Sequence, residues 1–404
     1  IVLGGSYPSY TSVGSTVPVS LTWEKSTTYD LGLDLDFLNN RLSFSGDYYR
    51  RYTTDMYTPS ISLPSVYGTT SPKGNNAELR TTGWELSLTW RDSFKLGGKP
   101  FDYSIKAMVW DNRTVVTKYE NATRSLGTLK GYIQNGGSPS DFYEGMELGE
   151  MWGYTVAGLF RDQADIDSSA THDFTQASDK VTRPGQVKIA DLDGNGFIDP
   201  GNFAVDDHGD LRIIGNQSPR YRYGVNLSAR RNGIGLSVFL QGVGARDWYP
   251  GSDAGMFWGK YGRPFFALIP SIHNYTDDMY SAERNNWDTA YWPRMTTYQS
   301  NGTKNWTRLL EIPNTRYIQS AAYLRVKNIQ LDYSFPKHIC SAIRLQGLKI
   351  YVNAENLFTF TPLHKYAPNF DPEGLSYDSD FASAADGYTY PILKSVTVGV
   401  NITF

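Results

Sequence analysis

The stretch from Asp191 to Asp199 carries the clearest chemical pattern in the chain. It reads Asp-Leu-Asp-Gly-Asn-Gly-Phe-Ile-Asp, so oxygen-bearing side chains stand at its positions 1, 3, 5 and 9. Gly196 at position 6 permits the sharp turn of an EF-hand-type calcium loop, and Phe197 at position 7 offers a backbone carbonyl. We therefore predict a calcium site whose ligands are Asp191, Asp193, Asn195, Phe197 and Asp199.

The pattern departs from a complete EF-hand at position 12. Asn202 stands there in place of the usual bidentate Glu, and we expect Asp206 or Asp207 to complete the oxygen shell. The alternative is an Asp- and Gly-rich turn that binds no ion. If the ion binds, its expected role is structural, in a long loop.

Aromatic residues form the second chemically competent set. The chain has 29 Tyr, 19 Phe and 10 Trp, and several of them stand in polar segments with few aliphatic neighbours. Exposed aromatic faces can stack on sugar rings or hold peptide side chains. We predict substrate contacts by Trp287, Tyr291, Trp292, Trp306 and Tyr366. For each of them the alternative is packing of loops against one another or against a partner protein.

Other classes of activity find little support. The five histidines show neither clustering nor metalloprotease spacing, and the nucleophile-elbow and phosphate-loop motifs do not occur. We therefore predict that the chain is not an enzyme. The net charge of −3 provides no basic field for nucleic acid. Cys340 is the single cysteine, and no apolar run reaches the 18 residues typical of a transmembrane helix.

Alternation of apolar and polar residues predicts the elements that must position these groups. The last stretch is typical: Val396, Val398, Val400, Ile402 and Phe404 share one face of a strand, and small polar residues share the other. The same pattern predicts about nine strands, within 31–37, 42–48, 84–90, 101–109, 221–230, 234–240, 329–335, 348–354 and 392–404.

Short and long connections between these strands alternate. Short turns are predicted at 39–40, 97–98, 232–233 and 336–343, and long connections at 58–76, 119–218, 246–320 and 359–391. Outer-membrane barrels have short turns at the periplasmic side and long loops at the extracellular side. The architecture of a β-sandwich does not favour this regular alternation. The segment Met151–Phe160 reads as a strand, but counting it in the wall would break the alternation, so we place it inside an extracellular loop.

The predicted sheet is incomplete as a barrel. Bacterial barrels have even strand numbers, and two open sheet edges cannot stand in lipid. Because the chain lacks an initiating Met and begins in a loop, we expect further strands of the same protein before Ile1, and the alternative is closure by another chain. Asp30, Asp34, Asp36, Arg222, Arg230 and Asp332 are expected to face the lumen.

Several motifs are spread along the chain: Trp23–Lys25, Phe37–Tyr49, Asp191–Asp199, Ile213–Asn216, Ser218–Tyr221, Ala322–Leu331, Val352–Leu357 and Asn401–Phe404. In this order they resemble the C-terminal part of SusC-like TonB-dependent outer-membrane transporters of the Bacteroidota. The resemblance implies about 22 strands around a plugged lumen, coupling to TonB through an N-terminal region absent here, and a SusD-like lipoprotein on the long loops. It also favours an ion-stabilised extracellular loop, and a terminal aromatic, Phe404, read during membrane assembly.

The predicted fold class is all-β, an antiparallel transmembrane barrel in which residues 1–404 form the C-terminal portion of the wall. The predicted function is import, across the bacterial outer membrane, of a nutrient too large for porins. An oligosaccharide is the first expectation for the cargo, and an oligopeptide is the alternative. Two rival interpretations are a soluble calcium-dependent glycan-binding sandwich and a barrel enzyme such as a lipase or protease.

Overall fold

The computed structural model describes residues 21–59, 73–121, 124, 126, 142–172, 182–250, 257, 278–294, 313–375 and 392–404. The largest element among these residues is one antiparallel sheet, called the wall sheet below. Its strands within the described residues, in spatial order, are β1 (Lys25–Phe37), β2 (Leu42–Pro59), β3 (Lys73–Leu96), β4 (Lys99–Lys118), β9 (Arg220–Arg231), β10 (Ile234–Ala245), β13 (Tyr323–Ser334), β14 (Gly347–Phe360) and β15 (Ser395–Thr403).

Smaller elements lie in the connections. Three two-stranded sheets join β5 (Glu150–Tyr154) to β8 (Leu211–Asn216), β6 (Val156–Leu159) to β7 (Val187–Ile189), and β11 (Asp247–Trp248) to β12 (Gln319–Ser320). The helical pieces whose bounds lie within the described residues are α2 (Gln163–Asp167), α5 (Lys337–Ala342) and the 3-10 turn η4 (Pro362–Lys365). No helix among the described residues is long and apolar enough to cross a membrane.

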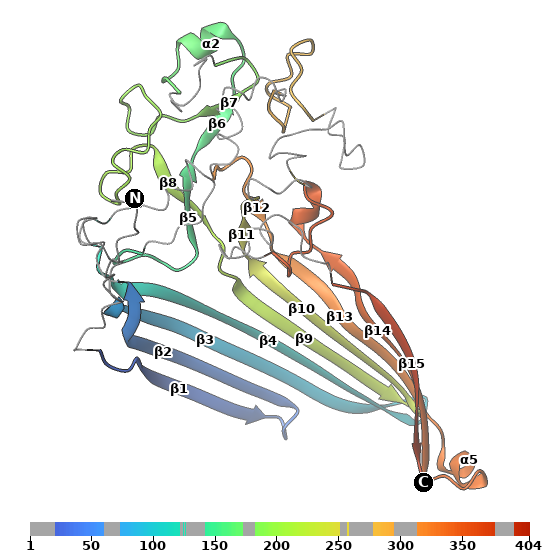
Figure 1. The fold of residues 1–404 in the computed structure, drawn as a ribbon. Coiled ribbons are helices and arrows are strands. Elements are labelled where there is room, and N and C mark those ends of the chain that lie inside the picture. The colour runs from blue at the N-terminus through green and yellow to red at the C-terminus, as the bar shows by residue number, and fades with distance from the viewer. Residues whose placement is uncertain are drawn as a thin grey trace, which may run out of the picture.

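The alternation of short and long connections is confirmed. Short turns join β1 to β2, β3 to β4, β9 to β10 and β13 to β14, whereas the long excursions gather at the opposite end of the wall sheet (Figure 1). Positive φ angles at Gly97 and Gly98, and at Asn232 and Gly233, match the tight hairpin turns that the sequence predicts. Within residues 151–160, the strand residues belong to β5 and β6, outside the wall sheet, as expected.

The strand ends differ from the predictions. β2 continues to Pro59 and β3 begins at Lys73, so their residues shorten the connection predicted at 58–76. β15 begins only at Ser395, three residues after the predicted start at Ile392. Alternating apolarity marks only the part of a strand with one apolar face, and in β2 and β3 backbone pairing continues beyond that part with polar residues on both faces.

Register aligns the apolar residues of successive strands on one face. One row of directly paired residues runs Leu35, Phe44, Leu88, Ala107, Val225, Leu240, Val326 and Phe358. Many large apolar side chains of this face are exposed, for example Leu31 at 75% and Val398 at 73%. A water-soluble surface rarely exposes so large an apolar patch.

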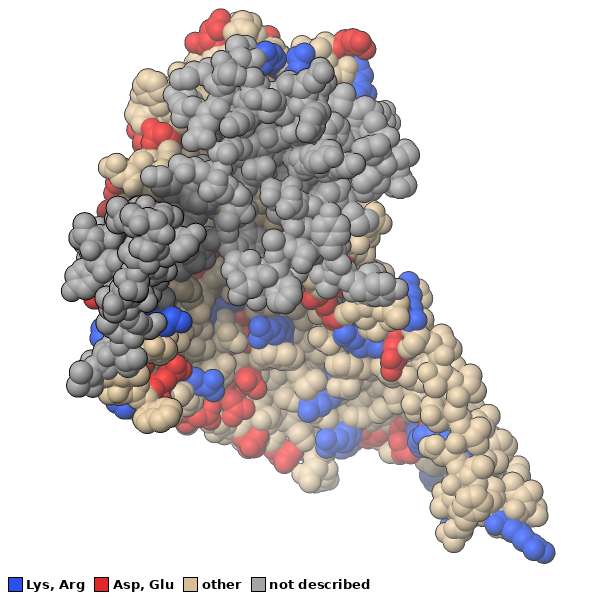
Figure 2. All heavy atoms as spheres, viewed as in Figure 1, with Lys and Arg blue, Asp and Glu red and all other residues tan. Residues whose placement is uncertain are grey.

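The opposite face is polar. The paired row Asp47, Glu85, Trp110 and Arg222 is typical of it. The register places on this face all six residues expected to face the lumen: Asp30, Asp34, Asp36, Arg222, Arg230 and Asp332. In Figure 2, acidic side chains gather over β1 to β3, and basic ones lie nearer the centre of the sheet.

The hydrophobic core lies in the long connections rather than on the wall sheet. We call this cluster the loop core; its fully buried members include Tyr154, Leu211, Trp248, Tyr249, Trp292, Tyr317 and Leu363. They come from the β4–β9, β10–β13 and β14–β15 connections, so segments far apart in sequence share one core. The loops at this end therefore form a packed unit of their own.

Candidate functional site

The Asp191–Asp199 loop folds around its own carboxylates. Asp191 accepts hydrogen bonds from the backbone N–H groups of Gly194 (2.6 Å) and Gly196 (2.9 Å). Asn195 donates one from its backbone to Asp193 at 3.0 Å. The backbone bond from Gly196 is the main cause that lowers the pKa of Asp191. Gly194 and Gly196 both have positive φ, as a loop that winds around a centre requires.

A residue outside the motif completes the acidic cluster. Carboxylate oxygens of Asp191, Asp193 and Asp210 lie within 4.8 Å of one another. Asp210 is fully buried and accepts backbone hydrogen bonds from Leu192 (2.6 Å) and Asp199 (3.0 Å). Burial raises its pKa, and the negative charges of Asp193 and Asp191 raise it further.

The residues expected to complete the oxygen shell lie elsewhere. Asp206 forms an ion pair with Arg124 at 2.8 Å, and Asp207 contacts the side chain of Asn202. Asp210, and neither Asp206 nor Asp207, is the residue grouped with Asp191 and Asp193 among the described residues. Sequence spacing pointed to position 12 of the motif and missed a residue 19 positions after its first Asp, because the intervening chain turns back through positive-φ residues at Gly201, Phe203 and Gly209.

A neighbouring segment braces the acidic loop. Thr171 forms a parallel bridge with Phe197, in which its N–H donates to Gly196 O at 2.9 Å. Next to it, His172 accepts a hydrogen bond from Ile189 N–H at 2.8 Å, and its other ring nitrogen lies 2.9 Å from Ala170 O. Burial lowers the pKa of His172, so the neutral ring that fits these two contacts is favoured.

The aromatic residues predicted to bind substrate take several positions. Trp292 is fully buried and stacks on Tyr317, with ring centroids 5.7 Å apart. Tyr291 and Tyr366 stack face to face at 3.6 Å. Trp287 is half-buried at the margin of the loop core. Trp306 lies outside the described residues. Among these described residues, ring faces mainly contact other rings of the loops.

A buried ionic cluster joins the β14–β15 connection to the polar face of the wall sheet. Arg325, only 2% exposed, donates to Asp371 at 2.6 Å and to Glu373 at 3.0 Å. Lys327 also pairs with Glu373, at 2.8 Å. Backbone carbonyls of the same connection accept hydrogen bonds from Arg246, including that of Pro372 at 3.2 Å. This part of the loop is held against the mouth of the wall sheet.

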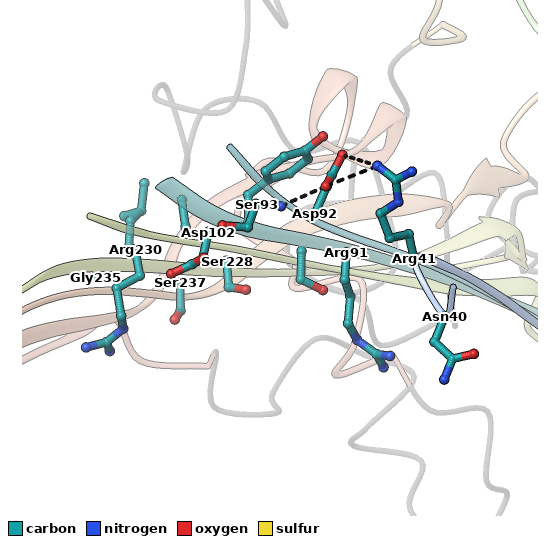
Figure 3. A pocket seen from close by; sticks show the side chains of 14 residues that line it. Asn40, Arg41, Arg91, Asp92, Ser93, Asp102, Ser228, Arg230, Gly235 and Ser237 are labelled. Carbon is teal, nitrogen blue, oxygen red and sulfur yellow. Dashed lines mark hydrogen bonds and ion pairs between the residues drawn. The ribbon is translucent and has the colours of Figure 1, made fainter. Parts of the chain in front are cut away.

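Further along the polar face, a hollow of about 720 Å³ lies against β3, β4, β9 and β10. In Figure 3, Arg91 and Arg230 extend to one side of the strands, while the pair Arg41 and Asp92 lies on the other side. Arg230 also reaches Asp332 at 3.1 Å, across β10 at Gly235. A side chain at Gly235 would meet the Asp332 carboxylate, so this glycine leaves the space for the ion pair.

The polar groups of this face can hydrogen-bond to a solute or to another protein segment, and they leave the apolar face free for a nonpolar environment. Sequence reasoning missed the Arg325 cluster and the pair between Arg220 and Asp111 (2.6 Å). No short-range signal could have found them, since their partners lie 46 and 109 residues apart.

Comparison with known proteins explains this division into two faces. Residues 3–195 match the family model described as TonB dependent receptor-like, beta-barrel. This stretch of the chain is similar to the TonB-dependent receptor β-barrels. This family consists of outer-membrane β-barrel transporters, so the apolar face of the wall sheet is the lipid-facing side and the polar face lines the lumen.

Relatives in the Bacteroidota match along nearly the whole chain. TonB-dependent receptor P3 of Formosa agariphila is 27% identical over 392 residues, which cover 95% of this chain and 34% of that protein. SusC of Bacteroides thetaiotaomicron is 24% identical over 395 residues, 95% of this chain and 32% of SusC. The chain thus spans about a third of the length of the relatives it matches.

Solved structures support the same fold. The RagAB peptide importer in its open-open state superposes with a TM-score of 0.63 at 19% identity, over 95% of this chain and 35% of that chain. The structure titled RagAB peptide transporter gives a TM-score of 0.60 at 18% identity, over 95% and 36%. At this identity the likeness concerns the fold.

Proposed function

We propose that this chain forms the C-terminal part of the barrel of a SusC-like TonB-dependent transporter, which imports a nutrient too large for porins. The observation that carries the proposal is the two-faced wall sheet, whose apolar rows align across its strands while a charged face lies behind them. Such a sheet suits a wall between lipid and a water-filled path.

The proposal includes segments outside these residues. β1 and β15 are the two edges of the wall sheet, and an unpaired strand edge is costly in lipid. We therefore infer that further strands of the transporter pair with both edges, and that a plug domain and a TonB-contacting segment complete it. A SusD-like lipoprotein is the proposed partner on the packed loops.

The proposed cargo is an oligosaccharide, with an oligopeptide as the second candidate. Trp287, half-buried at the margin of the loop core, could stack on a sugar ring. The lumen face favours the second candidate, because both carboxylates and guanidinium groups line it, as Asp47, Glu85 and Arg222 illustrate. Such a wall suits the charged ends and side chains of peptides.

An uptake assay tests this proposal. Cells carrying or lacking the full transporter would be supplied with a mixture of oligosaccharides and a mixture of oligopeptides, each too large for porins, and cargo uptake would be measured. We expect transporter-dependent uptake of one class, abolished when TonB is removed. Uptake of peptides alone would reject the oligosaccharide assignment, and TonB-independent uptake would reject the transport proposal itself.

We further propose that the Asp191–Asp199 loop binds a structural Ca²⁺. The donor set fits a hard cation, because three carboxylates lie within 4.8 Å of one another and the side-chain amide of Asn195 lies 3.1 Å from Asp193. Asp191, Asp193, Asn195, Asp199, the carbonyl of Phe197 and Asp210 would hold the ion. The positive ion would offset the repulsion among these carboxylates, and so stabilise the loop.

Metal removal tests this site. We expect chelation with EGTA to speed proteolysis and hydrogen exchange of residues 187–210 in the full transporter, and added Ca²⁺ to restore protection. Asp210→Asn should weaken Ca²⁺ affinity by at least about 10-fold. Asp206→Asn, in an exposed pair with Arg124, is the matched control and should leave affinity unchanged. Protection that does not respond to either EGTA or Ca²⁺ would contradict the assignment.

A further inference from the structure

Three arginines gather on the lipid-facing side of β2, β3 and β4. Arg50 and Arg113 are both paired with Thr82 of the strand between them, which places them in one row. Arg80 lies two residues beyond Thr82 on the same face, diagonal to both arginines. Diagonal neighbours on a sheet are about 7–8 Å apart, close enough for long side chains to reach one ligand.

The position of this cluster along the strands is specific. Towards the short turns, the same face carries apolar residues such as Leu33, Phe44 and Leu86. Tyr48 and Trp84, paired with each other, end this apolar band, and the arginines come next on the side of the long loops. Aromatic side chains mark the boundary between hydrocarbon and headgroups. The cluster therefore stands at headgroup level in the outer leaflet.

The cluster has an excess of positive charge. Arg113 is an exposed partner of Glu147, and Arg220 binds both Glu147 (3.2 Å) and Asp111 (2.6 Å). These two carboxylates balance these two arginines. Arg50, which is exposed, contacts the hydroxyl of Tyr48 at 3.4 Å, and Arg80 is exposed. Among the described residues, neither forms an ion pair with a carboxylate.

We propose that Arg50, Arg80 and Arg113 bind a phosphate group on the headgroup of an outer-leaflet lipid. Guanidinium groups match phosphate oxygens in two-pronged geometry. The apolar rows directly below supply a surface for the acyl chains of the same molecule. This continuity selects a lipid rather than a protein partner, because the site offers charge at headgroup level and hydrocarbon contact beneath it. The site lies outside the barrel and is independent of the cargo.

The test uses the full transporter in detergent micelles, with lipid A as the probe. Its binding would be measured by native mass spectrometry, together with lipid A from which the phosphates have been removed. The variant Arg50→Gln/Arg80→Gln should bind lipid A roughly 30-fold more weakly, and the dephosphorylated lipid should bind weakly to both proteins. Equal binding of the two lipids, or unchanged binding by the variant, would overturn the proposal.

Arg51→Gln provides a matched control. Arg51 follows Arg50 in the chain, but its side chain lies on the lumen face, where it donates to Thr28 at 3.2 Å. We expect this variant to bind lipid A like the wild-type protein. An equal loss in Arg51→Gln would show that charge alone, not the site, governs binding. Inorganic phosphate that binds as tightly as lipid A would reject the lipid as ligand. Thermal unfolding of each variant confirms that it is folded.

Discussion

Replacing Gly242 with alanine is expected to destabilise the barrel by about 1–3 kcal/mol or more and to reduce the amount assembled in the outer membrane. The ring of Tyr223 on β9 crosses β10 at Gly242, and its hydroxyl donates to Tyr323 O on β13 at 3.1 Å. A Cβ at Gly242 would overlap both that ring and that backbone carbonyl. The carbonyl oxygen of Tyr323 cannot move without shifting β13, so the rotation of a side chain alone cannot relieve the strain.

The measurement is the thermal midpoint of unfolding of the full transporter, followed by the change in gel mobility of the heated barrel. Gly347→Ala is the matched control, since a Cβ there would lie 3.5 Å from its nearest neighbour, Thr403. The Gly347→Ala variant should change the thermal midpoint of unfolding little. Gly399→Ala should fall between the two, because only the side chain of Tyr351 stands in the way. Equal midpoints for the three variants would refute the crossing-ring explanation.

Arg325→Met is expected to release the β14–β15 connection from the lumen mouth. Arg325 is buried between Asp371 and Glu373, and it also donates to Thr359 at 2.9 Å. Removing one partner of a buried ion pair leaves uncompensated charge and costs about 3–5 kcal/mol. Hydrogen exchange of residues 362–375 should therefore become faster by at least about 100-fold.

A comparison with an exposed pair isolates the effect of burial. Arg41 contacts Asp92 at 3.3 Å, with half of the Arg41 side chain exposed. Exposed pairs contribute about 0–1 kcal/mol, so Arg41→Met should leave exchange of residues 362–375 unchanged and the thermal midpoint nearly so. If Arg325→Met leaves exchange in that segment unchanged, the ionic cluster does not hold the loop, and the contacts of Leu363 and Phe370 in the loop core do.

The wall and the loops differ in what stabilises them. In the wall sheet, backbone pairing and lipid contact act together, and crossing rings such as Tyr223 over Gly242 add specific contacts between strands. The loops lie outside the wall sheet, and burial of aromatic residues such as Trp292 and Tyr317 stabilises them instead. The described parts of the long connections therefore form a packed surface at the mouth of the wall sheet.

The sequence by itself determined the wall. Side chains two residues apart on a strand share a face, so the alternation at Leu31–Phe37 or Val396–Phe404 identifies the apolar side of the strand without knowledge of any neighbour. Turn chemistry at Gly97-Gly98 and Asn232-Gly233 likewise depends only on local backbone angles. For this reason the predicted wall strands and the residues of the lumen face agree with the structure. The placement of residues 151–160 outside the wall also agrees, and it came from the alternation of short and long connections.

Only the tertiary structure decided which distant residues meet. Asp210 joins Asp191 and Asp193 because the intervening loop turns back on itself, and Arg325 of β13 meets Asp371 of the β14–β15 connection. The packing of Tyr291 against Tyr366 has the same origin. The acidic motif at Asp191–Asp199 shows this limit. Its spacing predicted the turn and most of the oxygen-bearing side chains of the cluster. The buried carboxylate of Asp210 joins them only because the chain between folds back, which no local sequence pattern indicates.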